Sequence, residues 1–214
     1  MKRLLILAVL LAAQPAFANH PGERIDEVMT EQELAFEVVD HPSTPNLDVE
    51  KSGGDVLRLG GLHDKIIVLS FVPRNCNSPC AKQQAVLAAV QEQVNVSPMK
   101  EMVRFVTVHD ADVSIEAPWD EANWRLVIPT DEETTAAAVD RFAALSSRDR
   151  ELPMAHVIDR NGRHAGIFHG AEFQKTNLTL YINGLINNMR APNPPTGNGW
   201  WEWLTGMFAT ERRN

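Results

Sequence analysis

Ile66-Ile-Val-Leu-Ser-Phe-Val-Pro-Arg-Asn-Cys-Asn-Ser-Pro-Cys80 is the most informative stretch of this chain. Residues 66–72 form an apolar run of β-forming residues, which at this length predicts a buried central strand. Residues 81–94, which follow the second cysteine, are mostly good helix formers. The sequence therefore predicts a strand that delivers two cysteines to the start of a helix.

Cys76 and Cys80 are the only two cysteines of the chain. A helix N-terminus has unpaired N–H groups and a partial positive charge, and both favour the thiolate over the thiol. A disulfide between these residues would close a small loop, which stabilises little in the chain-entropy account. A reactive or metal-binding pair is therefore favoured over a purely structural bridge.

The first residues have the three parts of a secretory signal peptide. Lys2 and Arg3 precede an almost wholly apolar run at residues 4–13, and Ala16-Phe-Ala18 is a small-x-small cleavage site. The run is well short of the ~20 residues that span a bilayer. We expect residues 1–18 to be removed and the mature protein to work in the periplasm, where disulfides persist.

The mature chain is acidic, because removing Lys2 and Arg3 changes the formal charge from −8 to −10. An acidic chain without a Lys/Arg cluster argues against binding to nucleic acid. The length suits one domain with short extensions. We expect an extended lead-in at residues 19–54, with a short helix near residues 30–36, a folded domain at 55–190, and a Pro/Gly linker with a Trp-rich tail at 191–214.

Strand and helix signals alternate through the folded domain. Asn161-Gly162 is a hairpin turn signal between the last two strands. The resulting order predicts an α/β protein with a mixed sheet covered by helices on both faces. The predicted strands are 55–59, 66–72, 103–108, 126–128, 154–158 and 164–168, and the predicted helices are 81–94, about 130–145 and about 172–189.

This order, with a cysteine pair at a strand-to-helix junction, resembles a thioredoxin-like fold. Glu151-Leu-Pro153 precedes a strand that ends at Val157-Ile-Asp159, followed by a glycine turn. The proline looks like the one that thioredoxin-like proteins hold cis beside their cysteines. The resemblance implies that Pro153 is cis, lies close to the sulfurs, and leaves neighbouring backbone groups free to pair with an extended partner chain.

The Cys-x-x-x-Cys spacing, after a Ser-Phe strand and before a helix, is similar to the Sco/SenC family of cytochrome oxidase assembly proteins. Asn123-Trp-Arg-Leu-Val-Ile128, followed by an acidic helix start, also resembles that family. The resemblance implies copper binding or delivery, thiol-disulfide exchange, and a partner protein with a thiol/disulfide or copper site, such as a cytochrome oxidase subunit. The copper-binding histidine of the family would fall near Glu151, which is not a histidine.

The two thiols permit both kinds of chemistry. Thiolates are soft ligands that select Cu(I), and a third imidazole would also allow Cu(II). The same pair can cycle between dithiol and disulfide, with one thiolate attacking a partner and the other resolving the mixed disulfide. We expect Cys76, before the helix, to attack and Cys80, in its first turn, to resolve.

The histidines include two candidate metal ligands. His156 follows Pro153 and shares a face with Met154 and Ile158, so it is either a buried core histidine or a third copper ligand. His109 ends a predicted strand, at the edge where open α/β sheets place ligands. We expect His164 and His169 to lie at the surface.

Two further possibilities follow from the sequence. The Trp-rich tail either contacts a membrane surface or a partner groove, or folds back over an apolar patch. A non-catalytic binding module, with a permanent disulfide on a thioredoxin scaffold, is the main alternative to a redox or copper protein. A peroxidase is a weaker alternative, because no Thr-x-x-Cys context precedes a lone peroxidatic thiol.

Overall fold

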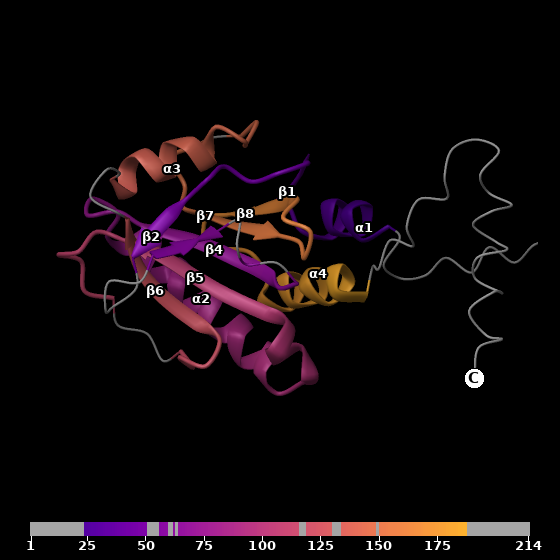
Figure 1. Cartoon of the computed structure of the whole chain (residues 1–214). Helices are drawn as coiled ribbons and strands as arrows, with labels where there is room; N and C mark the ends of the chain where they lie inside the picture. Colours follow the sequence, from indigo (N-terminus) through magenta and orange to yellow (C-terminus); the bar gives the residue numbers. More distant parts are fainter. Residues whose placement is uncertain are drawn as a thin grey trace, which may run out of the picture.

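The computed structural model describes residues 24–50, 56–59, 62, 64–115, 119–129, 134–148 and 150–187 (Figure 1). The predicted signal peptide at residues 1–18 and the predicted linker and Trp-rich tail at 191–214 lie outside these ranges. Within the described ranges, no helix has both the length and the apolar character needed to cross a membrane.

An eight-stranded mixed sheet forms the centre of the domain, in the order β1-β8-β7-β4-β5-β6-β2-β3. Strand β4 pairs in parallel with β5, and β5 with β6, whereas the other pairings are antiparallel. The strands are β1 (Phe36–His41), β2 (Asp48–Glu50), β3 (Val56–Arg58), β4 (Ile66–Val72), β5 (Val103–His109), β6 (Trp124–Pro129), β7 (Met154–Ile158) and β8 (His164–His169).

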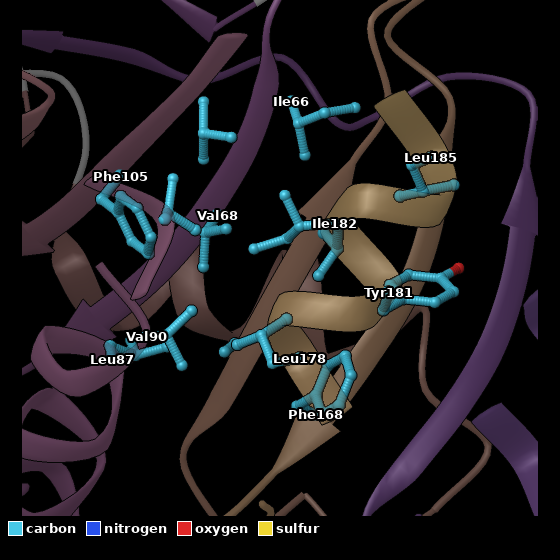
Figure 2. Packing of buried hydrophobic residues seen from close by; sticks show 14 of the residues in the cluster. Ile66, Val68, Leu87, Val90, Phe105, Phe168, Leu178, Tyr181, Ile182 and Leu185 are labelled. Carbon is cyan, nitrogen blue, oxygen red and sulfur yellow. The ribbon is translucent and has the colours of Figure 1, made fainter. Parts of the chain in front are cut away.

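Helices cover both faces of the sheet, with α3 on one side and α2 and α4 on the other (Figure 1). Strand β4 separates two core clusters, because its successive side chains point to opposite faces. Ile66 and Val68 pack with α2 and α4, as Figure 2 shows, whereas Ile67 and Leu69 join the cluster that contains Phe142 of α3. The helices are α1 (Ile25–Gln32), α2 (Ser78–Asn95), α3 (Thr135–Ala143) and α4 (Lys175–Asn187), with a short 3₁₀ helix, η2 (Pro98–Met102).

The predicted thioredoxin-like α/β fold is confirmed. Strand β4 has the predicted bounds, and each of its residues is buried. Helix α2 begins earlier than residue 81, with Asn77 as its N-cap and a proline in its first turn. Proline is favoured there because its missing N–H would lack a helical partner in any case. Cys76 thus precedes the helix and Cys80 lies in its first turn, as predicted.

The lead-in is more structured than its sequence indicates. Its helix is α1, at Ile25–Gln32, so the expected position near residues 30–36 is wrong. The lead-in also contributes β1 and β2 to the sheet. Phe36 anchors β1, because its fully buried ring contacts Phe168 and Tyr181 at centroid distances of 5.0 and 4.7 Å. These partners lie more than 130 residues away, so no local pattern reports them.

The helix expected from about residue 130 begins at Thr135 instead. The Thr134 hydroxyl accepts a hydrogen bond from the backbone N–H of Ala137 and thereby caps the helix. Threonine is one of the residues that can satisfy an unpaired N–H at a helix start. Residues 131–133, which carry the acidic start signal, lie outside the described ranges.

Candidate redox site

Cys76 and Cys80 form a disulfide between the loop after β4 and the first turn of α2. The two sulfurs differ in environment. Cys80 is 1% exposed, and its Sγ lies 3.5 Å from the carbonyl oxygen of Phe71, whereas Cys76 is partly exposed. Access to a sulfur limits the rate at which a partner can attack it. Cys76 is therefore the sulfur available to a partner, and Cys80 is placed to resolve the mixed disulfide.

The disulfide opens on a pocket of about 300 Å³. Helix α3 and the segment that enters β7 also line this pocket. The pocket contains Cys76, Cys80, Pro153 and His156 but not His109, so the fold brings together segments about 75 positions apart. Its lining includes Phe71, Cys76, Pro79, Cys80, Val139, Arg150, Glu151, Leu152, Pro153, Met154 and His156.

Pro153 lies in the wall of this pocket, but the Leu152–Pro153 peptide bond is trans. The prediction of a cis bond is therefore wrong; trans is the isomer that X–Pro bonds generally favour, by about 0.5–1 kcal/mol. The Pro153 carbonyl is also not free, because it accepts hydrogen bonds from Gln83 Nε2 at 2.9 Å and from the Gly170 N–H at 2.7 Å. Contact of Pro153 with a partner chain stays a prediction.

Gln83 supports the wall of the site, although no sequence pattern predicts this role. It lies on α2 and is fully buried, and its Nε2 also donates to the carbonyl oxygen of Gly170 at 2.8 Å. One side-chain amide thus joins the cysteine-bearing helix to the segments before β7 and after β8. A glutamine one turn beyond a cysteine carries no sequence signal for this role, because both partners are distant backbone carbonyls.

His156 is buried, 1% exposed, and lines the disulfide pocket. Its Nδ1 lies 3.2 Å from Nε2 of His164, and its ring packs edge-on against Phe71 and Phe142. Burial, and to a lesser degree the nearby His164 and His169, lower the pKa of His156 well below its ordinary value. His156 is therefore a buried, neutral histidine in this structure, and its alternative role as a third copper ligand stays a prediction.

No complete metal-binding group is present in the described part of the chain: three or more His, Cys, Asp or Glu side chains do not converge there on one point. His156 shares the pocket with the cysteines but is not assembled with them as a third ligand. His109, the other candidate, is partly exposed, and its Nδ1 lies 2.9 Å from the carbonyl oxygen of Asp110. Among the described residues, the Cys76–Cys80 pair therefore has no assembled third ligand.

The expected surface location of His164 and His169 is wrong, since they are 0% and 6% exposed. Strand β8 lies between β1 and β7, so it is an interior strand rather than an edge. His164 contacts His156, and His169 contacts Glu37 on β1. The sequence could not show this burial, because it depends on β1, which was expected to be part of the lead-in.

Glu37 is a buried carboxylate that holds several segments together. It accepts hydrogen bonds from the Ser146 hydroxyl at 2.6 Å, the Ser147 hydroxyl at 2.7 Å, the Ser147 N–H at 2.8 Å and His169 Nε2 at 2.8 Å. Burial raises the pKa of Glu37, but the hydrogen bonds from Ser146, Ser147 and His169 outweigh it and lower the pKa to about 2. The carboxylate therefore fixes the segment that leads to Pro153.

Replacing Glu37 with Gln should lower the free energy of unfolding at pH 7 by about 1–3 kcal/mol, because an amide cannot accept all four hydrogen bonds. The pKa of Glu37 is lower in the folded state, so its stabilisation is present above about pH 4.5 and is lost as the pH falls toward 2. Urea unfolding at pH 7 and pH 3 should show a smaller difference between wild type and variant at pH 3. Glu92→Gln, at an exposed position, is the control. An equal difference at both pH values would contradict this role.

The buried side chain of His164 should cause a second dependence of stability on pH. Burial, with a smaller effect of His41, lowers the pKa of His164 to about 4. The unfolded chain therefore binds a proton near pH 6.5, where folded His164 remains neutral, and stability falls as the pH drops from about 6.5 to 4. His164→Phe should reduce this loss in urea-unfolding curves, and His109→Gln should not. If the free energy of unfolding of the His164→Phe variant depended on pH as steeply as that of wild type, His164 would not be the source of this pH dependence.

The sequence itself matches no model of a known protein family, and no curated protein matches it. Solved structures do match the fold. BsSco, described as a member of the Sco family of cytochrome c oxidase assembly proteins with a disulfide switch, is 13% identical, with a TM-score of 0.56; the match covers 70% of this chain and 96% of that chain.

Two other Sco proteins are similar over a comparable share of this chain. Yeast Sco1 with copper bound is 12% identical, with a TM-score of 0.55, and apo Sco1 from Thermus thermophilus is 16% identical, with a TM-score of 0.50. Each match covers 71% of this chain and 96% of the other chain. The fold and site thus define a thioredoxin-fold protein with a Cys-x-x-x-Cys disulfide. Its fold is of the Sco/SenC kind, which confirms the predicted resemblance at the level of the fold.

Proposed function

We propose that this protein exchanges its Cys76–Cys80 disulfide with a cysteine pair of a partner protein outside the cytoplasm. The observation that carries the proposal is the difference between the two sulfurs, one partly exposed and one buried behind it, at a pocket next to a helix start. A structural bridge has no need of an accessible sulfur that opens on a pocket.

The exchange is a reversible two-electron reaction. A partner thiolate attacks Cys76 Sγ, the Cys76–Cys80 bond breaks, and Cys80 leaves as a thiolate. The second partner thiolate then attacks the partner's own sulfur in the mixed disulfide, and Cys76 leaves. The partner is oxidised to a disulfide and this protein is reduced to the dithiol; the reverse sequence reduces a partner disulfide.

The proposed setting is the periplasm, and the proposed process is cytochrome oxidase assembly. The signal-like residues 1–18 and the disulfide support an oxidising compartment. The likeness to Sco structures supports a partner that carries a thiol/disulfide or copper site, such as a cytochrome oxidase subunit. Peripheral contact of the Trp-rich tail with a membrane belongs to the same proposal.

Copper is proposed as cargo of the reduced protein. Two thiolates are the soft ligands that Cu(I) prefers, so the reduced pair fits this ion. The Sco copper-binding histidine would fall near Glu151, which is not a histidine, and His156 directs one ring nitrogen at His164 rather than completing a site with the sulfurs. We therefore expect Cu(I), and not Cu(II), to be the form that this protein carries.

Reaction with glutathione disulfide tests the exchange. Reduced wild-type protein should become oxidised at Cys76 and Cys80 and release reduced glutathione, whereas a Cys76→Ser/Cys80→Ser variant should release none. The products can be followed by mass spectrometry after acid quenching. A reduced protein that does not react, or an oxidised protein that strong thiol reductants leave intact, would instead favour a binding module with a permanent disulfide.

A further inference from the structure

A second groove lies directly beside the disulfide pocket. It has a volume of about 500 Å³ and shares Pro79, Leu152 and Pro153 with that pocket. The two cavities are therefore neighbours across one wall. A chain whose cysteine reaches Cys76 from this side would lie in the second groove.

The walls of this groove are held in place by hydrogen bonds. Gln83 joins the carbonyl groups of Pro153 and Gly170, and Glu37 holds His169. The guanidinium group of Arg148 donates to the carbonyl oxygens of Leu34 and Phe36 at 2.7 and 2.6 Å. The groove is thus preformed, which reduces the ordering cost of binding.

Two exposed leucines line the groove. Leu34 is 90% exposed and Leu152 is 50% exposed, and both belong to the few large apolar side chains that this surface presents to water. One comes from the turn before β1 and the other from the segment before β7. Apolar side chains gathered in a concave surface favour contact with an apolar group of a partner.

The charge of the groove is opposite to that of the whole protein. Lys82 and Arg148 line it, and Glu172 is the one carboxylate among its lining residues. Among the residues that the structure describes, Lys82 forms no ion pair, and the guanidinium group of Arg148 donates only to carbonyl oxygens. Two cations without carboxylate partners, in a chain of net charge −8, favour an anionic group of a partner.

We propose that this groove docks an extended segment of the partner protein, with a carboxylate and an apolar side chain next to the partner's reactive cysteine. This inference rests on the proposed exchange function. The apolar side chain lies against Leu34 and Leu152, and the carboxylate pairs with Lys82 and Arg148. The groove thereby determines which partner cysteines can react with Cys76.

Three peptides test the docking. Each carries one cysteine in a mixed disulfide with glutathione and a neighbouring leucine, and they differ only in a flanking Glu, Gln or Lys. Reduced full-length protein should react fastest with the Glu peptide and slowest with the Lys peptide, with a difference of about fivefold that shrinks in high salt. Lys82→Glu should reverse the order. Arg58→Glu has the same change in charge on β3, at the far edge of the sheet, and should keep the order.

Each other outcome has a definite meaning. Equal rates for the three peptides, with normal reaction toward glutathione disulfide, would overturn the docking inference and leave the exchange function intact. Failure to react with any disulfide would overturn the exchange function itself. A dimer that Lys82→Glu dissociates, detected by sedimentation, would assign the groove to a second copy of the chain and overturn the proposed occupant.

Discussion

Cys80→Ser protein should accumulate a stable mixed disulfide through Cys76, whereas Cys76→Ser protein should react with the same disulfide at least roughly tenfold more slowly. The reason is access, because Cys80 is 1% exposed and Cys76 is partly exposed. Without Cys80, no neighbouring thiol can resolve the bond that Cys76 has formed. Without Cys76, the remaining thiol is shielded from the partner.

Glutathione disulfide and mass spectrometry suffice to compare the two variants. Both should react at similar rates once unfolded in urea, because unfolding exposes Cys80; this comparison separates shielding from the intrinsic reactivity of each thiol. Equal rates in the folded state, or faster reaction of the Cys76→Ser variant, would contradict the assigned roles of the two sulfurs.

Reduced wild-type protein should bind one Cu(I) through both sulfurs, and either cysteine-to-serine variant should lose affinity by about 100-fold or more, because a hydroxyl is a poor ligand for this soft ion. Cu(II) should bind weakly, since the third ligand that it would require is not assembled with the cysteines. We therefore expect this chain to bind Cu(I) much more tightly than Cu(II).

Anaerobic titration with a competing Cu(I) chelator measures the affinity for Cu(I), and visible absorbance reports binding of Cu(II). A strong thiolate-to-Cu(II) charge-transfer band would contradict weak Cu(II) binding. If that band disappeared in His156→Ala or His109→Ala but not in His41→Ala, which changes an exposed histidine, the third ligand would be identified.

Local sequence patterns were sufficient for the central part of the fold. The apolar run at residues 66–72 is a strand buried on both faces, and the cysteines lie at the start of the next helix, as predicted. Asn161-Gly162 forms the expected turn, where Gly162 has a φ of +81° that glycine adopts without strain. Each of these features depends on residues that are close in sequence.

The features that the sequence missed depend on distant partners. The segment after Ala35 becomes strand β1 because it pairs with β8, and this pairing buries Glu37 and His169. Gln83 acquires its role from two carbonyl groups of distant segments. The cis isomer of Pro153 was predicted only from the resemblance to thioredoxin-like proteins. In the structure the Leu152–Pro153 bond is trans, and the Pro153 carbonyl accepts a hydrogen bond from the Gly170 N–H.

Equilibration of the full-length protein in graded thiol buffers, followed by trapping of free thiols, tests the central claim most directly. The fraction of protein with free Cys76 and Cys80 should rise and fall reversibly with the buffer potential, with the same midpoint from either direction. A pair that stays oxidised in buffers as reducing as thioredoxin, about −270 mV, would contradict a reversible redox site and leave a permanent disulfide.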